Sequence, residues 1–111
     1  MNFTEYQTLA RRTQNVRINS HERLEHALHG LCSEVGEIHS IFQKVYQGHP
    51  VKMADLIGEM GDALWFLAEL ADVHGLTLDE IAAANIEKLR RRYPDGFSEE
   101  DSLHREEDDD A

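Results

Sequence analysis

Two long stretches of this sequence carry apolar residues in alternating steps of four and three, and this spacing constrains the fold more than any other feature. In the first stretch, up to about Gln47, these positions are Leu24, Leu28, Leu31, Val35, Ile38, Phe42 and Val45. In the second, from about Val51 to His74, they are Met53, Leu56, Met60, Ala63, Leu67 and Leu70. Such spacing forms one apolar stripe along a helix, suited to packing against another helix. The sequence therefore predicts two long, packed helices.

The short connection between these two stretches predicts that the helices are antiparallel. Asn19 followed by Glu22 predicts a capping box where the first helix begins. Gly48 is expected to end that helix, and Pro50 to lie in the first turn of the next. With two shorter segments, about 4–14 and 77–92, the sequence predicts an all-α fold resembling a four-helix bundle.

Size and charge limit the possible functions. The 111 residues suit one domain, and the formal net charge of -11 excludes a general nucleic-acid partner, because no basic surplus neutralises phosphates. A single cysteine, Cys32, fits a reducing, cytoplasmic setting, and no apolar run is long enough for a membrane span. We expect a helical domain over residues 1–98 and a disordered, solvated acidic tail over 99–111.

Two acidic pairs lie beside the apolar stripes. Glu34 and Glu37 on the first helix are three residues apart, as are Glu59 and Asp62 on the second, so each pair shares a helix face. Antiparallel helices can bring all four carboxylates together, where they repel one another unless a cation binds. Oxygen-only ligands favour Mg²⁺ or Mn²⁺ over zinc. The nearby glycines, Gly36, Gly58 and Gly61, suggest close approach of a neighbouring helix or a ligand.

Two other interpretations of the acids remain open at this point. Acidic pairs of this spacing are common on solvated helix faces, so a metal site and a plain surface are about equally favoured by the residues alone. A di-iron centre is disfavoured, because such sites need Glu-x-x-His on helices. Here Glu37 and Asp62 occupy the positions at which such sites have histidine. The single acid-x-x-His of this sequence, from Asp101 to His104, lies in the predicted tail.

The fourth predicted helix carries a polar stripe. Asn85, Lys88 and Arg92 are spaced by three and four residues, and Tyr93 follows directly. Cations and an amide in one row can bind phosphate oxygens that a divalent metal also holds. A basic helix end is also a common complement to the helix dipole, and alone that interpretation is preferred. Lys44 and Lys52, near the turn between the long helices, are weaker phosphate candidates.

These motifs together resemble the MazG-like all-α nucleoside triphosphate pyrophosphohydrolases, in the short, stand-alone form that includes bacteriophage proteins. The resemblance covers roughly residues 3–98 and rests on "EVGE", "EMGD" and the later run "NIEKLRRRYPDGF". It implies hydrolysis of a nucleoside triphosphate to monophosphate and pyrophosphate, with Mg²⁺ on Glu34, Glu37, Glu59 and Asp62. It also implies a homodimer or a homotetramer. The expected location is the cytoplasm, which is the host's cytoplasm if a phage encodes the protein.

The same resemblance assigns roles around the reacting phosphates. Asn85 and Lys88 match positions that contact the triphosphate, and Arg92 and Tyr93 match less closely. Glu34 is expected both to hold metal and to assist the attacking water, with Lys88 as a second catalytic group. Which phosphorus is attacked stays open, as does the purpose of the reaction, pool cleansing or supply of a modified nucleotide.

The base specificity is the least constrained property. Trp65 and Phe66 follow Asp62 and can stack on a base, although core packing explains at least one of them equally well. His26 and His29 precede the first acidic pair and can line a pocket. Because phage-type relatives include dGTP-hydrolysing enzymes, we expect a deoxynucleotide, with dGTP first. A non-catalytic helical interaction module with a degenerate nucleotide site is the alternative.

Overall fold

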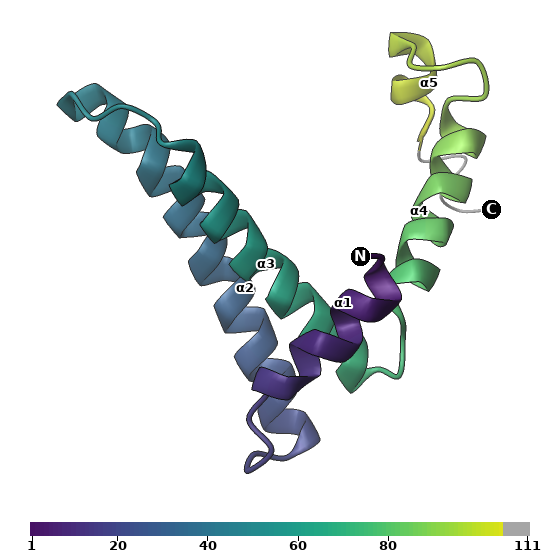
Figure 1. The fold of residues 1–111 in the computed structure, drawn as a ribbon. Helices are drawn as coiled ribbons and strands as arrows, with labels where there is room; N and C mark the ends of the chain where they lie inside the picture. Colours follow the sequence, from purple (N-terminus) through teal and green to yellow (C-terminus); the bar gives the residue numbers. More distant parts are fainter. Residues whose placement is uncertain (106–111) are drawn as a thin grey trace. The chain divides into compact units, whose positions relative to one another are not determined.

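The computed structural model describes residues 1–105, which form helices and turns without a β-strand (Figure 1). The elements are α1 (Phe3–Ala10), a 3-10 turn (Arg11–Thr13), α2 (Ser20–Gln43), a 3-10 turn (Lys44–Gln47), α3 (Met53–Val73), α4 (Leu78–Arg92) and α5 (Glu99–Leu103). The all-α prediction is confirmed. None of the described helices combines the length and apolarity that crossing a bilayer requires.

Helices α2 and α3 form an antiparallel hairpin, as predicted (Figure 1). The capping box is present: the Asn19 side chain accepts from the Glu22 amide at 2.8 Å, and the Glu22 carboxylate accepts from the Asn19 amide at 3.0 Å. Gly48, with φ of 88°, ends the first arm in the left-handed region. The local residues therefore fix where α2 begins and where its last turn closes.

The prediction that Pro50 lies in the first turn of the second long helix is wrong. Helix α3 begins at Met53, and Lys52, with φ of -97° and ψ of 121°, is its extended N-cap residue. Pro50 belongs to the connection instead. The chain must cross from one arm of the hairpin to the other, and extended backbone covers that distance in few residues, whereas helix does not.

Helix α1 crosses the end of the hairpin that lies away from this turn (Figure 1). Gln7 of α1 is buried, and its amide donates to Asp72 at 2.7 Å and to the Leu76 carbonyl at 2.9 Å. Arg11 forms an ion pair with the same carboxylate at 3.0 Å, and Gln14 donates to its other oxygen at 2.8 Å. This polar network attaches the N-terminal segment to α3.

The chain divides into two compact units, Met1–Thr77 and the segment from Leu78 onward. In the second unit a turn follows α4, since the Gly96 amide donates to the Tyr93 carbonyl at 3.2 Å. The expected tail begins with a helix, α5, because the Ser98 hydroxyl caps it by accepting from the Asp101 amide at 3.0 Å. The prediction of a disordered tail from residue 99 is therefore corrected for residues 99–103, which are helical. Residues 106–111 of the predicted tail lie outside the described residues.

Candidate metal and nucleotide site

Three of the four predicted carboxylates meet across the hairpin. Glu34 comes from α2, and Glu59 and Asp62 come from α3, one helical turn apart. One oxygen from each side chain lies within 4.8 Å of the others. We call these three residues the acid triad. The antiparallel pairing creates it, because residues 34 and 62 are far apart in sequence and reach the same level of the hairpin.

The electrostatics of the triad indicate crowded negative charge. A hydrogen bond to Glu59, burial, and the charges of Glu59, Asp62 and Glu37 raise the pKa of Glu34 to about 7. The second oxygen of Glu34, Oε2, is buried and has no hydrogen-bond partner in the described chain. Burial and the charge of Asp62 also raise the pKa of Tyr6, which places this α1 residue near the cluster.

The donor set of the triad fits a hard divalent cation. All the available atoms are carboxylate oxygens, the ligand type that Mg²⁺ and Mn²⁺ prefer. A cation would remove the repulsion that raises the pKa of Glu34 and would give its orphaned oxygen a partner. The residues present therefore match the group that the acidic motifs imply.

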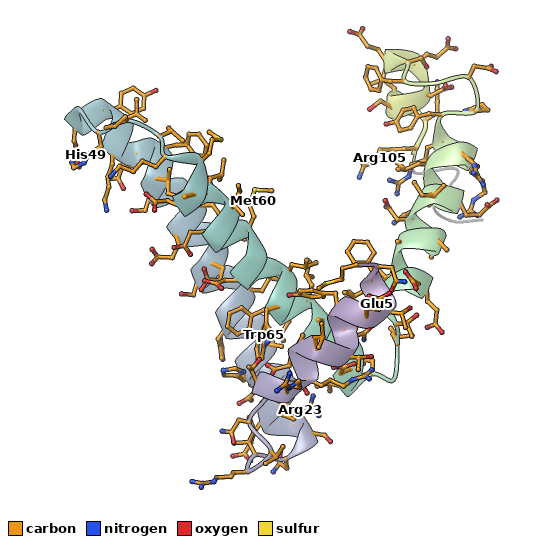
Figure 2. The ribbon with its side chains drawn as sticks, viewed as in Figure 1. Glu5, Arg23, His49, Met60, Trp65 and Arg105 are labelled. Atoms are coloured by element: carbon orange, nitrogen blue, oxygen red, sulfur yellow. The ribbon has the colours of Figure 1, made fainter. Side chains whose placement is uncertain are left out.

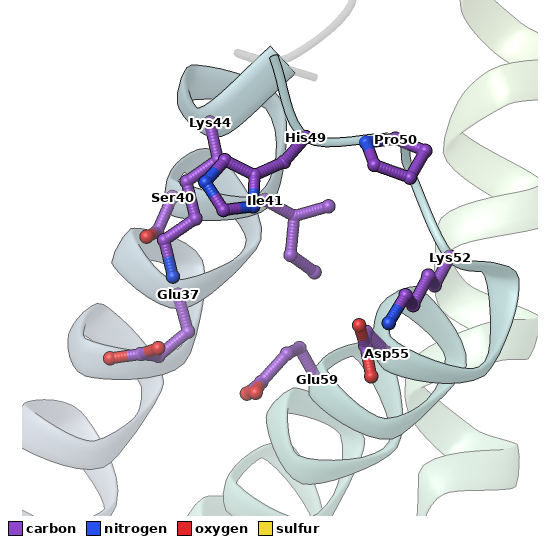
Figure 3. A pocket seen from close by; sticks show the side chains of 9 residues that line it. All are labelled: Glu37, Ser40, Ile41, Lys44, His49, Pro50, Lys52, Asp55 and Glu59. Carbon is purple, nitrogen blue, oxygen red and sulfur yellow. The ribbon is translucent and has the colours of Figure 1, made fainter. Parts of the chain in front are cut away.

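Glu37 lies beside the triad and outside its 4.8 Å group. Its charge reaches Glu34, and its side chain lines a groove of about 320 Å³ on the turn side of the triad. We call this cavity the turn groove (Figure 3). Its lining residues are Glu37, Ser40, Ile41, Lys44, His49, Pro50, Lys52, Asp55 and Glu59.

A second cavity, of about 370 Å³, opens on the opposite side of the triad. Its lining residues are Thr13, Glu34, Asp62, Trp65 and Phe66, and we call it the aromatic pocket. The indole N–H of Trp65, a residue labelled in Figure 2, donates to the Thr13 hydroxyl at 2.8 Å, so the 3-10 turn after α1 holds the ring. Trp65 and Phe66 pack edge to face with centroids 5.2 Å apart. Both predicted aromatics therefore line a cavity that shares carboxylates with the triad.

A buried acid contacts a histidine that packs against the aromatic rings of this pocket. Glu69 is 0% exposed, and its Oε1 lies 2.6 Å from Nδ1 of His26. The imidazole of His26 packs edge-on against both Trp65 and Phe66. His26 was predicted to line a pocket, and it contacts the rings that do so. Neither Glu69 nor Thr13 was singled out in the sequence, although an acid inside the apolar run "ALWFLAELA" of α3 was a visible signal.

Gly30, which was not among the glycines expected to be closely approached, is closely packed. A Cβ atom on Gly30 would overlap the ring of Phe66, so this position of α2 admits no side chain without movement of the ring. Gly36, Gly58 and Gly61, in contrast, have nothing within 4 Å of a built Cβ. Within the described chain no helix approaches these three glycines, because their faces of the hairpin are uncovered, and the approach of a ligand stays a prediction.

The predicted phosphate-binding residues of the fourth helix belong to the second unit. Asn85, Lys88 and Arg92 all lie within α4, where their spacing places them on one face. Tyr93 follows the helix, and its ring lies 5.5 Å from that of Phe97. Their approach to the acid triad stays a prediction.

Comparisons with known proteins find a matching family and similar sequences. Residues 21–97 match the MazG nucleotide pyrophosphohydrolase domain. The chain is 30% identical over 83 residues to the gene 37 protein of Mycobacterium phage L5, covering 70% of this chain and 73% of that protein. It is 44% identical over 39 residues to the uncharacterized protein YvdC of Bacillus subtilis strain 168, covering 35% of this chain and 37% of that protein.

No solved structure matches this chain. The matched domain includes α2 from its second residue and the whole of α3 and α4, and with them the acid triad, the turn groove and the polar stripe. The non-catalytic interaction module that the sequence left open is therefore set aside. The chain belongs to the MazG family and is a nucleotide pyrophosphohydrolase.

Proposed function

We propose that this enzyme hydrolyses a deoxynucleoside triphosphate, dGTP first among the candidates, to the monophosphate and pyrophosphate with Mg²⁺ as its cofactor. The observation that carries the proposal is the acid triad, with a buried, unpartnered oxygen on Glu34. A crowded all-oxygen cluster beside an aromatic pocket suits a substrate that combines a metal-bound polyphosphate with a stacking base.

Glu34, Glu37, Glu59 and Asp62 are the proposed metal ligands, with Mn²⁺ able to substitute. When bound, the metal would neutralise charge on phosphate oxygens and make a coordinated water more acidic. Glu34 is also the proposed group that assists the attacking water, because it belongs to the triad and lines the aromatic pocket as well. It can therefore contact both metal and substrate.

The remaining substrate contacts are proposed from two regions. Lys88, the second catalytic group, would stabilise negative charge on the phosphates, and Asn85, Arg92 and Tyr93 would bind phosphate oxygens. Trp65 and Phe66 would hold the base by stacking, and a purine offers them the larger face. The reaction would serve nucleotide-pool control or the supply of a modified nucleotide in the cytoplasm, that of the host if a phage encodes the protein.

A substrate panel tests the proposal. Purified protein is incubated with each of the eight common ribo- and deoxynucleoside triphosphates in Mg²⁺, in Mn²⁺ and in excess EDTA, and the products are separated. We expect monophosphate and pyrophosphate from deoxynucleotides, fastest from dGTP, with no turnover in EDTA. Release of orthophosphate would contradict the reaction type, metal-independent turnover would contradict the cofactor, and a preferred base other than guanine would contradict the substrate.

We also propose that the protein is a homo-oligomer, a dimer or a tetramer. One face of the hairpin carries an apolar groove, lined by Ile38, Ile57, Met60, Gly61, Ala63, Leu64 and Leu67. Ile57 is 69% exposed and Met60 is 55% exposed. The groove has no charged side chain, so a second copy of this acidic chain can approach here without bringing carboxylates together.

Light scattering at micromolar concentration measures the assembly, and Ile57→Asp tests the face. We expect a dimer or tetramer for the natural sequence and dissociation of the variant, because a charge in an apolar interface is costly. A monomer mass near 12.7 kDa for the natural sequence with full activity would refute the oligomer. Unchanged assembly of Ile57→Asp would place the interface elsewhere.

The functional unit is proposed to be residues 1–98. Ending the chain after Ser98 removes α5 and the acidic residues beyond it. We expect near-normal turnover and helical content for the shortened protein, since neither cavity beside the triad contains a residue beyond 66. A large loss of circular dichroism signal or of activity would show that the removed segment takes part.

A further inference from the structure

The turn groove combines opposite charges at its two ends. Carboxylates of Glu37, Asp55 and Glu59 line the end next to the triad, whereas Lys44, His49 and Lys52 line the end next to the α2–α3 connection. Figure 3 shows the ammonium groups of Lys44 and Lys52 directed into the groove, from opposite arms of the hairpin. Two cations thus face one cavity that begins at the candidate metal site.

Neither lysine is neutralised within the described chain. The ion pairs found in residues 1–105 involve Arg11, His21, His26 and Arg90, and none involves Lys44 or Lys52. In a protein with 22 acidic and 11 basic residues, two unpaired lysines in one groove are available to an anionic ligand. Lysine is a common phosphate ligand that acts as a point charge.

The two cavities lie in a fixed order along the hairpin. Glu34 and Asp62 of the triad line the aromatic pocket, and Glu59 of the triad lines the turn groove with its neighbour Glu37. An extended molecule that crosses the triad therefore meets aromatic rings on one side and lysines on the other. A nucleoside triphosphate has the same order of chemistry, with a base at one end and its most negative phosphates at the other.

We infer that the turn groove is the subsite for the β- and γ-phosphoryl groups, with Lys44, Lys52 and His49 binding the part of the substrate that leaves as pyrophosphate. The inference rests on the proposed function and adds a direction of binding: base toward α1, pyrophosphate toward the α2–α3 connection. In the reaction, water adds to one phosphorus of the α–β anhydride, the bridging P–O bond at that phosphorus breaks, and a proton is released. The lysines then hold the separated pyrophosphate.

The carboxylates at the triad end add a requirement for metal. Glu37, Asp55 and Glu59 repel a free pyrophosphate ion that enters the same groove. A divalent cation on the triad offsets two of these negative charges and offers phosphate oxygens a positive ligand. Pyrophosphate is therefore expected to bind tightly with Mg²⁺ and weakly in EDTA, even though the lysines are present in both conditions.

Calorimetric titration with inorganic pyrophosphate provides a test that needs no turnover. The double variant Lys44→Ala/Lys52→Ala is compared with Arg12→Ala/Arg17→Ala, which removes two positive charges from exposed positions outside both cavities. In Mg²⁺ we expect the lysine variant to bind pyrophosphate at least about tenfold more weakly, corresponding to about 1.4 kcal/mol. Pyrophosphate binding should change less than about twofold in the control Arg12→Ala/Arg17→Ala and in the charge-conserving variant Lys44→Arg/Lys52→Arg. The binding of dGMP to Lys44→Ala/Lys52→Ala should also change less than about twofold.

The outcomes separate this inference from the proposed function. If Lys44→Ala/Lys52→Ala and Arg12→Ala/Arg17→Ala weaken pyrophosphate binding equally, the effect comes from net charge alone, and the proposed subsite is overturned. Equal weakening of dGMP and pyrophosphate binding by the lysine change would overturn the direction of binding. If the panel shows no nucleotide turnover while pyrophosphate binding still depends on Lys44 and Lys52, the proposed function fails and the anion site remains.

Discussion

The two ends of the α2–α3 hairpin differ in how completely they are packed. At the end that α1 crosses, Ala27, Ala68, Ala71 and Glu69 are buried, and Asp72 accepts hydrogen bonds from three side chains of the N-terminal segment. Between residues 35 and 61, at the end with the connection, no residue is buried. The acid triad lies where these two environments meet.

This difference shows which part of the molecule supplies rigidity and which part receives ligands. The packed end fixes Trp65 through Thr13, and fixes Phe66 through Gly30 and His26. The open end presents the turn groove and the apolar groove. Changes at the packed end should therefore reduce stability, whereas changes at the open end should alter binding or assembly.

The largest expected effect on activity comes from changes in the acid triad, which lies between the packed end and the open end of the hairpin. Asp62→Asn and Glu34→Gln should each lower kcat/KM by at least about 100-fold, because a lost metal ligand removes several kcal/mol of transition-state stabilisation. The metal-free variants should also melt at a higher temperature, since neutralising one carboxylate relieves the repulsion within the triad. Steady-state kinetics and thermal melts measure both effects.

Glu25→Gln is the matched control, because Glu25 is an exposed acid of α2 far from the triad, paired with His21 at 3.2 Å. It should behave as the natural protein in both assays. Near-normal turnover in both triad variants would rule out this metal site.

Gly30→Ala should produce the largest loss of stability at the packed end. The added methyl overlaps the Phe66 ring, and overpacking of this kind costs about 2–3 kcal/mol in unfolding free energy. Denaturant titration measures the loss, and Trp65 fluorescence reports the local movement, because the two rings are in contact. A stable variant with unchanged fluorescence would contradict the tight packing of this pocket.

Asp72→Asn should destabilise the same end by about 2 kcal/mol at neutral pH, because it removes a charged acceptor with a side chain only 7% exposed. Burial alone would raise the pKa of Asp72, but hydrogen bonds from Arg11, Gln14 and Gln7 outweigh it and hold the pKa below its usual range. Its stabilising effect is therefore complete above the unfolded pKa, near 4, and disappears as the pH falls through the folded pKa.

Unfolding titrations of the natural protein and Asp72→Asn from pH 7 down to pH 2 test this sign. The two stability curves should converge at the acidic end. Curves that diverge as the pH falls would show that the carboxylate is not held in its charged form by these donors.

Gly58→Ala should give the smallest change, and in the opposite direction. A Cβ at this open position meets nothing within 4 Å, so the exchange should stabilise α3 by about 1 kcal/mol through helix propensity alone. The same denaturant titration measures it. A loss of stability instead would mean that another copy of the chain packs closely against this face.

Much of the local structure was predictable because it depends on neighbouring residues. The spacing of apolar residues gave the two long helices, Asn19 and Glu22 gave the capping box, and Gly48 gave the end of the first arm. Antiparallel pairing across a short connection then brought three of the four predicted carboxylates together, Glu34, Glu59 and Asp62. The start of α3 was misplaced, since the width of the hairpin, which no single residue encodes, decides how long the extended connection must be.

The sequence by itself determined the helices, the acidic motifs and the family to which they belong, because each of these depends on residue type and spacing along one chain. Only the tertiary structure decided that Gly30 faces Phe66, that buried Glu69 contacts His26, and that two cavities of different chemistry flank the triad. Each of these features joins α2 to α3 or to the segment after α1. Spacing fixes which face of a helix a residue occupies, but packing between elements decides what that face meets.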